Sequence, residues 1–318
     1  MTIRSFLKLV EIQTKVASII PFFLGTVYTL YRFDNFNLKN FIIMFISLIT
    51  LDMGTTAINN YMDYRRAVKK YGYNYEMHNA IVKYNLKEST VLATVIILFT
   101  MAVVFGILLY INTNVIILLL GAVSFAASVL YSYGPIPISH MPLGEIFSGL
   151  FMGFLIVFIS IFIHLHDSNI ILYSFAQGIL NFSLNIKELL FIFLLCIPSI
   201  VGIANIMLAN NICDMEDDIV NKRYTLPIFI GRERALRLFR ALYYIAYLDV
   251  ILLLILKIIP IISAVSLLTF FPVIKNVKKF FRKQTKKDTF VFAVKNFVIL
   301  NIVQVITICI GAIGKAVF

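Results

Sequence analysis

Charged residues are scarce in this chain of 318 residues, since Asp, Glu, Lys and Arg together make up 14% of it. A soluble globular domain carries about 25% of these residues. Hydrophobic residues make up 60% of the chain instead, and its mean hydropathy is +0.92. So much apolar sequence cannot be enclosed in one water-soluble core. The composition therefore predicts a protein that is solvated by lipid.

Cysteine is rare and tryptophan is absent. The three cysteines, Cys196, Cys213 and Cys309, are odd in number and form no CxxC pair, which argues against a disulfide framework or a structural zinc site. We expect Cys196 and Cys309 to be packing residues in lipid-embedded helices. Without tryptophan, aromatic faces have to come from the 29 Phe and 16 Tyr.

Nine apolar runs follow one another along the chain, most of them close to the roughly 20 residues that a helix needs to cross a bilayer. They cover roughly residues 10–31, 40–61, 89–110, 114–132, 144–164, 188–211, 236–257, 258–274 and 290–313. Between the fifth and sixth runs, residues 166–187 are mixed in character, and we expect a short interfacial segment there. The pattern predicts an all-α, polytopic transmembrane bundle of about nine helices, with residues 1–318 forming a single domain.

Basic residues indicate how this bundle is oriented. Of the 28 lysines and arginines, 22 lie in the N-terminal segment and in the second, sixth and eighth connections, so that alternate loops are basic. Since cytoplasmic loops carry the excess of Lys and Arg, we expect the N-terminus inside and the C-terminus outside. The same distribution accounts for the net charge of +12, and we therefore expect no nucleic-acid partner.

Two similar polar motifs stand at the cytoplasmic ends of the second and sixth runs. Residues 59–63 read NNYMD and residues 210–214 read NNICD, and in the second motif Asp217 and Asp218 follow closely. Asp214 and Asp218 are neighbours on a helix surface, as are Asn59 and Asp63. The loops that carry the motifs, 62–88 and 212–235, also contain basic residues suited to diphosphate oxygens. Gathered carboxylate oxygens suit Mg²⁺.

Simpler explanations exist for these residues. Asn and Asp are common at helix ends, and basic loop residues follow the orientation rule whatever the function. Asp52 lies well inside the second apolar run, on the same helix face as Asp63. An acid within the membrane usually faces an internal cavity. A carboxyl group that is hydrogen-bonded to a neighbouring helix is the alternative, and it carries more weight for Asp249 in the seventh run.

At these motifs the chain resembles the UbiA superfamily of intramembrane prenyltransferases, which places one Asp-rich motif after its second helix and another after its sixth. Further stretches are similar to the 1,4-dihydroxy-2-naphthoate polyprenyltransferase branch. They are PFFLGTVYT at 21–29, AIVKYNLK at 80–87, SYGPIPISHMPLGEIFSG at 132–149 and NKRYTLPIFIGRERA at 221–235. Together they cover most of the chain from residue 10 to about 240. The last third matches in hydropathy alone.

The resemblance implies transfer of a polyprenyl group from polyprenyl diphosphate to an aromatic quinone precursor in the membrane, with Mg²⁺ as cofactor. For 1,4-dihydroxy-2-naphthoate, CO₂ and pyrophosphate leave, a step of menaquinone biosynthesis. The implied catalytic residues are Asp63, Asp214 and Asp218, which also bind the metal with help from Asn60 and Asp217. The implied substrate-binding residues are Asn59, Arg65, Lys69 and Arg223 at the diphosphate end, and Asp52, Tyr131 and Tyr133 at the acceptor end.

The chain departs from the family pattern at three places. The family usually has Asn-Asp where this chain has Asn59-Asn60, so that one carboxylate is an amide. Cys213 stands where a basic residue is common, and His78-Asn79 stands where Gly-Gly is common. Another acceptor, such as 4-hydroxybenzoate or homogentisate, remains an alternative. A transporter or Mg²⁺ channel is an alternative of a different class.

Overall fold

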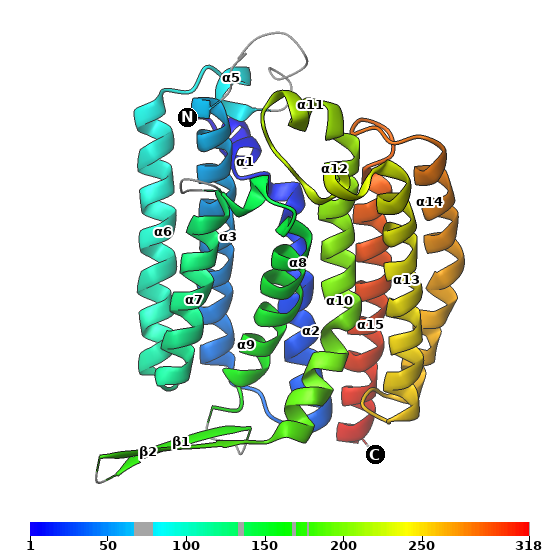
Figure 1. The fold of residues 1–318 in the computed structure, drawn as a ribbon. Helices are drawn as coiled ribbons and strands as arrows, with labels where there is room; N and C mark the ends of the chain where they lie inside the picture. Colours follow the sequence, from blue (N-terminus) through cyan, green and yellow to red (C-terminus); the bar gives the residue numbers. More distant parts are fainter. Residues whose placement is uncertain (67–78, 133–136, 167–169, 177, 318) are drawn as a thin grey trace.

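A computed structural model of the chain describes residues 1–66, 79–132, 137–166, 170–176 and 178–317. Helices that run roughly parallel to one axis make up most of it (Figure 1). The helices are α1 (Ile3–Leu9), η1 (Ile12–Thr14), α2 (Val16–Phe33), α3 (Leu38–Arg66), α5 (Ala80–Lys83), α6 (Glu88–Ile111), α7 (Val115–Ser132), η2 (Ile138–His140), α8 (Gly144–Ser148), η3 (Gly149–Leu155), α9 (Ile156–Phe162), α10 (Ile186–Cys213), α11 (Met215–Val220), α12 (Leu226–Ile230), α13 (Arg232–Ile255), η4 (Ile261–Thr269), α14 (Phe270–Arg282) and α15 (Val291–Val317).

The predicted membrane bundle is confirmed. Within the described residues, eight helical segments are long and apolar enough to span a bilayer, and the shorter apolar helix 115–131 adds a ninth at the fourth predicted run. Helices suit this environment because every interior backbone group is satisfied within its own segment, where lipid offers no partner. Helices α8, η3 and α9 form the fifth span together, and η4 with α14 forms the eighth.

Two details differ from the sequence-based expectation. Residues 171–176 and 179–184 form the two strands of a hairpin, β1 (Ile171–Ala176) and β2 (Ile179–Leu184), antiparallel with Ile171 opposite Leu184. The hairpin projects from the end of the bundle where the C-terminus lies (Figure 1). The eighth span continues to Arg282, beyond the expected residue 274, because the amphipathic segment after Phe270 stays helical and buries Val273, Val277 and Phe280.

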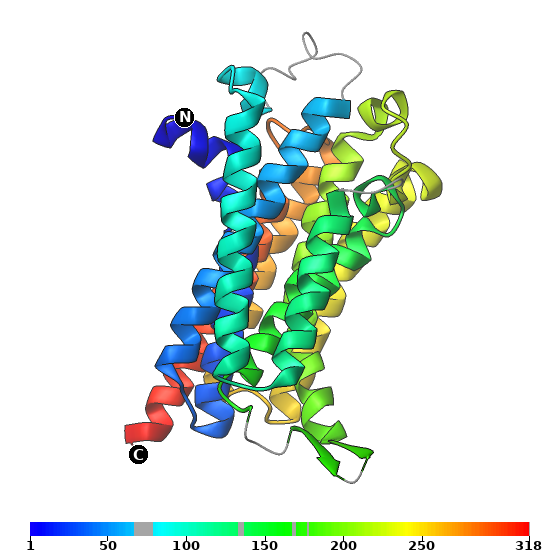
Figure 2. The same cartoon turned by 90° about the vertical axis from the view of Figure 1, so that its left-hand side faces the viewer.

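Helix pairing divides the bundle into two groups, and the cyan and blue-green helices α6 and α7 of the first group lie in front of the others in Figure 2. In the first group α3 packs closely along α6, and α7 lies beside them. The second group joins α2, α8 to α10, α13, η4, α14 and α15. Close approaches between the groups are few, and side-chain packing across them is concentrated at the end opposite the acidic motifs, where Met44 of α3 shares a core cluster with Phe22 and Phe158. Most residues of α3 between Leu51 and Asn59 are only half-buried.

The fifth span and α10 form a close contact within the second group. A Cβ atom added to Gly153 would lie 2.5 Å from the Cα atom of Ile200, and one added to Gly149 would lie 3.0 Å from its carbonyl oxygen. Small residues let two membrane helices approach this closely. This contact fixes the position of α10, and α10 carries the second acidic motif at its end.

Candidate active site

The two acidic motifs meet at one end of the bundle, where α3 and α10 both terminate (Figure 1). Arg223 joins them directly. Its guanidinium Nη2 donates to Asp63 Oδ1 of the first motif at 3.4 Å, and its Nη1 lies 4.0 Å from Asp218 Oδ1 of the second motif. Residues 160 positions apart in the sequence therefore share one site.

The fold of residues 214–225 explains how Arg223 reaches this position. Helix α10 ends at Cys213, and the short helix α11 begins directly after Asp214. Lys222 then adopts a positive φ of 56°, which turns the chain back. As a result the Arg223 amide donates to the Asp218 carbonyl at 2.8 Å, and the Thr225 hydroxyl donates to Asp218 Oδ2 at 3.3 Å. This turn fixes both the carboxylate and its cationic neighbour.

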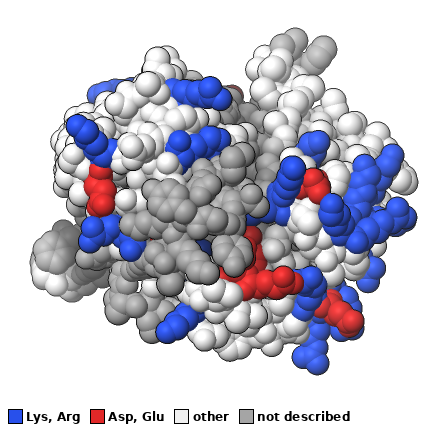
Figure 3. Space-filling model, turned by 90° about the horizontal axis from the view of Figure 1, so that it is seen from above, with Lys and Arg blue, Asp and Glu red and all other residues white. Residues whose placement is uncertain are grey.

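Asp214 has a different cationic partner, which the sequence did not point to. Lys286 Nζ, from the loop between α14 and α15, donates to Asp214 Oδ2 at 2.5 Å. The end view in Figure 3 shows that the acidic side chains of this face lie in small groups, each with basic side chains beside it. Each of the three predicted catalytic carboxylates thus has a Lys or Arg neighbour.

The residues present fit a magnesium ion by the chemistry of their donors. Mg²⁺ takes carboxylate and phosphate oxygens and water, and the site offers Asp63, Asp214 and Asp218. Burial raises the pKa of Asp218 to about 6 even though Arg223 beside it acts in the opposite direction. Two cationic side chains, Arg223 and Lys286, lie beside these three carboxylates, so a bound cation would supply the remaining positive charge. No three acidic, His or Cys side chains among the described residues are already grouped as a metal site.

The other predicted metal ligands are placed less directly. Asn60 is buried, and its amide nitrogen donates to the Leu9 carbonyl at 2.9 Å and to Glu11 Oε1 at 3.4 Å, on the N-terminal segment rather than toward Asp63. A metal role for Asn60 stays a prediction that these contacts do not support. Asp217 is exposed on α11, on the turn that carries Asp218. Asn59 lies on α3 one turn before Asp63.

Of the residues predicted to bind substrate, some lie in the site and others do not. Arg223 lies in the site, whereas Arg65 pairs with Glu88 at the start of α6, with 3.2 Å between Nη1 and Oε2. Lys69 and Tyr133 lie outside the described residues. Tyr131, at the end of α7, reaches across to α10, where its hydroxyl lies 3.5 Å from Met207 Sδ.

Asp52 is hydrogen-bonded to a neighbouring helix, which was the simpler of the two explanations for it. Lys15 Nζ donates to Asp52 Oδ1 at 2.6 Å and to Thr56 Oγ1 at 2.7 Å, and Ser18 Oγ donates to Asp52 Oδ2 at 2.6 Å. Lys15 is 2% exposed and Asp52 is 14% exposed. This cluster of Lys15, Ser18, Asp52 and Thr56 joins the two helix groups. At the rise per residue of an α-helix, Asp52 lies about 16 Å from Asp63 along α3.

Two more contacts join the loops at this end. Asn211 of the second motif donates its amide hydrogen to Glu145 Oε1 at 2.9 Å, and both side chains are buried. The Tyr224 amide, next to Arg223, donates to the His140 carbonyl at 3.0 Å. The segment 138–145 therefore supports the loop that carries Arg223. In the sequence, only the resemblance of residues 132–149 to the family pattern had pointed to this supporting segment.

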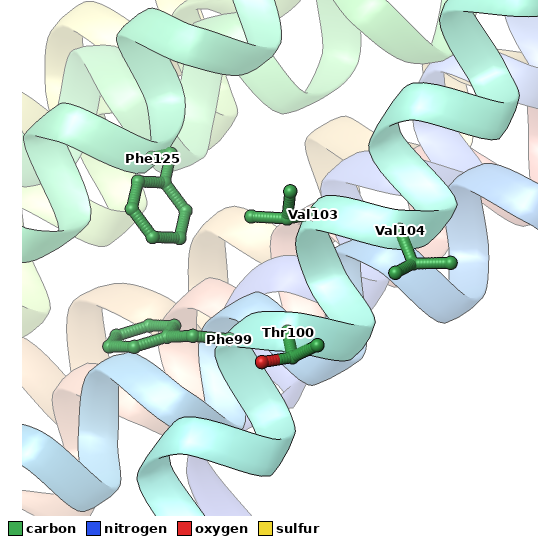
Figure 4. A pocket seen from close by; sticks show the side chains of 5 residues that line it. All are labelled: Phe99, Thr100, Val103, Val104 and Phe125. Carbon is green, nitrogen blue, oxygen red and sulfur yellow. The ribbon is translucent and has the colours of Figure 1, made fainter.

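An apolar pocket of about 260 Å³ lies on α6 and α7, away from the acidic motifs. Phe99, Thr100, Val103, Val104 and Phe125 line it (Figure 4). Phe99 and Phe125 meet edge to face with their ring centroids 5.3 Å apart. The lining offers no charged group for a diphosphate, so this pocket suits hydrocarbon and is distinct from the site at the end of α3.

Comparison with known proteins gives consistent matches. The sequence profile of the UbiA prenyltransferase family matches residues 18–302. The 1,4-dihydroxy-2-naphthoate octaprenyltransferase of Bacillus subtilis (strain 168) is 30% identical over 239 residues, which cover 75% of this chain and 70% of that protein.

Solved structures match over nearly the whole chain. A UbiA homologue from Aeropyrum pernix K1, in its apo form, superposes with a TM-score of 0.69 at 19% identity, covering 96% of this chain and 98% of that one. A UbiA homologue from Archaeoglobus fulgidus bound to GPP and Mg²⁺ superposes with a TM-score of 0.67 at 15% identity, covering 96% and 99%. At these identities the likeness shows a shared fold.

Proposed function

Since the chain belongs to the UbiA prenyltransferase family, as its motifs had suggested, we propose that it transfers a polyprenyl group from polyprenyl diphosphate to 1,4-dihydroxy-2-naphthoate, with loss of CO₂ and pyrophosphate. The chain is thus a membrane-embedded enzyme, and the transporter alternative is set aside. The observation that supports the proposed site most strongly is Arg223, which lies between Asp63 of one motif and Asp218 of the other.

The proposed metal site follows from the carboxylates gathered at this end. Asp63, Asp214 and Asp218 would hold Mg²⁺, with Asn59 and Asp217 nearby. Bound Mg²⁺ neutralises charge on the diphosphate and makes it a better leaving group. A solved relative with bound GPP and Mg²⁺ supports a divalent metal for the family. Arg223 then supplies a planar, permanently charged group for the diphosphate oxygens.

The position of the site suits both parts of the donor substrate. A polyprenyl tail is soluble in the bilayer, whereas its diphosphate needs charged partners at the water interface. The acidic motifs lie at the ends of α3 and α10, and the half-buried part of α3 extends from there into the bundle. We propose that the tail lies along this part of α3, between the two helix groups. There, Phe and Tyr faces would stabilise the allylic cation, and exclusion of water would protect it from hydrolysis.

The acceptor reaction balances without an added base or oxidant. The bond between the prenyl carbon and the diphosphate oxygen breaks, and pyrophosphate leaves with the electron pair. The ring carbon that bears the carboxylate attacks the allylic cation and forms the new carbon–carbon bond. The bond to the carboxylate then breaks, CO₂ leaves, and its electron pair returns to the ring. We place the acceptor near Asp52, Tyr131 and Tyr133, where a carboxylate or phenol oxygen would hold its hydroxyl groups.

The orientation of the bundle is part of the proposal. We propose that the end with the acidic motifs faces the cytoplasm, together with the N-terminus, and that the C-terminus lies outside. Alternate basic loops support this orientation. In intact cells, a membrane-impermeant thiol reagent should therefore label Ser183→Cys in the hairpin and leave Lys287→Cys unlabelled until the membrane is opened. Labelling of both sites in intact cells would contradict the proposed orientation.

Analysis of the reaction products tests the proposed decarboxylating prenyl transfer. Purified protein with Mg²⁺, a polyprenyl diphosphate and 1,4-dihydroxy-2-naphthoate labelled in its carboxyl carbon should release labelled CO₂ and form an unlabelled prenylated ring, as seen by mass spectrometry. With 4-hydroxybenzoate in its place, substitution beside the hydroxyl would retain the carboxylate. Refusal of the naphthoate, together with turnover of 4-hydroxybenzoate or homogentisate, would refute the acceptor and leave the prenyltransferase activity intact.

A further inference from the structure

We infer that Lys286 is a diphosphate-binding residue that is held on Asp214 in the metal-free enzyme and moves to the diphosphate when metal occupies Asp214. This inference rests on the proposed function, since it adds a substrate contact to the same site. It assigns a role to the loop between α14 and α15, which lies in the third of the chain where no sequence motif pointed to function. The contact that carries it joins Lys286 Nζ to Asp214 Oδ2.

The backbone of this loop is fixed, so that Lys286 is held beside the second acidic motif. The Thr289 and Phe290 amides donate to the Thr285 carbonyl at 3.0 and 3.1 Å, and the Thr285 amide donates to Thr289 Oγ1 at 2.9 Å. Thr289 is buried, which anchors the turn against the bundle. The turn thus sets the position of the Lys286 Cα atom, while four side-chain torsions leave its ammonium group free to change partner.

The pairing at the site shows why a change of partner is expected. Arg223 contacts Asp63 and Asp218, and Lys286 contacts Asp214, so that two cations lie beside three carboxylates. A metal ion bound to Asp214 competes with Lys286 for the same carboxylate, whose Oδ2 Lys286 now contacts. The displaced ammonium group would then lie beside a ligand that brings several negative charges of its own. A phosphate oxygen is the natural new partner for a flexible point charge of this kind.

A purely structural salt bridge is the competing explanation, and the exposure of the pair argues against it. Lys286 is 42% exposed and Asp214 is 15% exposed. Ion pairs open to water to this extent contribute little to stability, because solvent screens them and the lysine side chain loses freedom. Replacement of Lys286 should therefore leave the fold intact, and effects on ligand binding can be read without unfolding.

Lys287 offers a matched control. It is the next residue in the same exposed turn and carries the same charge, so that Lys287→Gln changes the general electrostatic field as much as Lys286→Gln does. Lys283 is less suitable because it pairs with Asp288. Lys286→Arg keeps a cation of similar reach and should restore most of the diphosphate binding that Lys286→Gln loses.

The test measures binding in detergent without turnover. Mn²⁺, which electron paramagnetic resonance detects when free, replaces Mg²⁺, and geranyl S-thiolodiphosphate, which resists ionisation, replaces the donor. In Lys286→Gln, Mn²⁺ alone should bind about three- to tenfold more tightly because its competitor for Asp214 is gone. At saturating metal, the thiolodiphosphate should bind about three- to tenfold more weakly because a phosphate contact is lost. Lys287→Gln should change both constants by less than about twofold.

Opposite shifts of the two constants in Lys286→Gln, beyond those in Lys287→Gln, support the inference. It is overturned if either constant matches the control, or if metal binding weakens in Lys286→Gln. In these cases wild-type protein still binds both ligands, and the proposed function stands. If wild-type protein binds neither ligand, the proposed function fails and takes the inference with it.

Discussion

The buried pair of Lys15 and Asp52 offers a quantitative test of how the two helix groups are joined. Lys15 is the N-cap residue of α2, Asp52 lies in α3, and these helices make few close approaches to each other. The side chain of Lys15 is only 2% exposed, and its ammonium group lies 2.6 Å from Asp52 Oδ1. Removal of one partner from a buried ion pair leaves an uncompensated charge and costs about 3–5 kcal/mol. We expect that cost for Lys15→Met.

The double variant Lys15→Met with Asp52→Leu separates the charge from the packing. It removes both charges at once, and the remaining polar atoms keep partners. Ser18 Oγ also donates to the Lys15 carbonyl at 3.0 Å, and Thr56 Oγ1 donates to the Asp52 carbonyl at 3.0 Å. Replacement of a buried ion pair by apolar residues is often neutral or stabilising. The double variant should therefore recover most of the stability that the single variant lost.

Reversible unfolding in mixed detergent micelles, followed by circular dichroism, measures the free energy of unfolding of wild type, both single variants and the double variant. Activity gives a second readout, because the proposal places Asp52 beside the acceptor. The double variant should be stable and still lose turnover with a raised KM for the acceptor. A Lys15→Met protein as stable as wild type, or a double variant as unstable as the single one, would refute the reasoning.

Four further outcomes follow from the contacts at the two ends of the bundle. Asp63→Asn should abolish turnover without unfolding the protein, and chelation of divalent metal should do the same reversibly; full activity in either case would remove the two-motif mechanism. Arg223→Gln should lower kcat/KM for the prenyl diphosphate by about a hundredfold or more, as expected for a charged transition-state contact. Arg65→Gln loses only an exposed pair with Glu88 and should lower kcat/KM by less than about tenfold. Equal losses in the two variants would contradict the placement of Arg223, and not Arg65, in the site. Asn60→Asp should lower the thermal midpoint, because it removes the donor to the Leu9 carbonyl and sets a carboxylate near Glu11; a lower metal requirement at unchanged stability would instead show that Asn60 binds metal. Burial lowers the pKa of His164 to about 4, so that below about pH 6.5 the unfolded chain binds more protons than the folded one. The thermal midpoint should therefore fall from pH 7 to pH 5, and His164→Gln should lack this fall. An equal fall in wild type and His164→Gln would contradict this role of His164.

The arrangement of the helices could be read from the sequence to a large extent. Within the part of the chain that the structure describes, the nine apolar runs correspond to nine helical segments, because lipid forces long apolar stretches to satisfy their own backbone groups. The two Asp motifs could be placed at one end, since each follows an even number of crossings from the same N-terminus. Residues 171–184 could not be assigned in this way. Their alternation was too short to distinguish a hairpin from an irregular interfacial segment.

Within the site, the sequence identified residue types and the tertiary structure decided their partners. Asp63, Asp218 and Arg223 were expected near one another, and they are. Arg65 looked equivalent to Arg223 in the sequence, but the side of α3 on which it lies turns it toward Glu88. Asn60, one residue from Asn59, faces the N-terminal segment because adjacent residues on a helix point about 100° apart.

The sequence by itself determined that this protein is a membrane helix bundle with two acidic motifs at one end, because hydropathy and helix counting are local properties. Only the tertiary structure decided that Lys15 lies against Asp52 and Lys286 against Asp214. These partners are 37 and 72 residues apart in the chain, and nothing in their own segments distinguishes them from other basic residues that orient the bundle. A charge acquires its role from the groups that folding places around it.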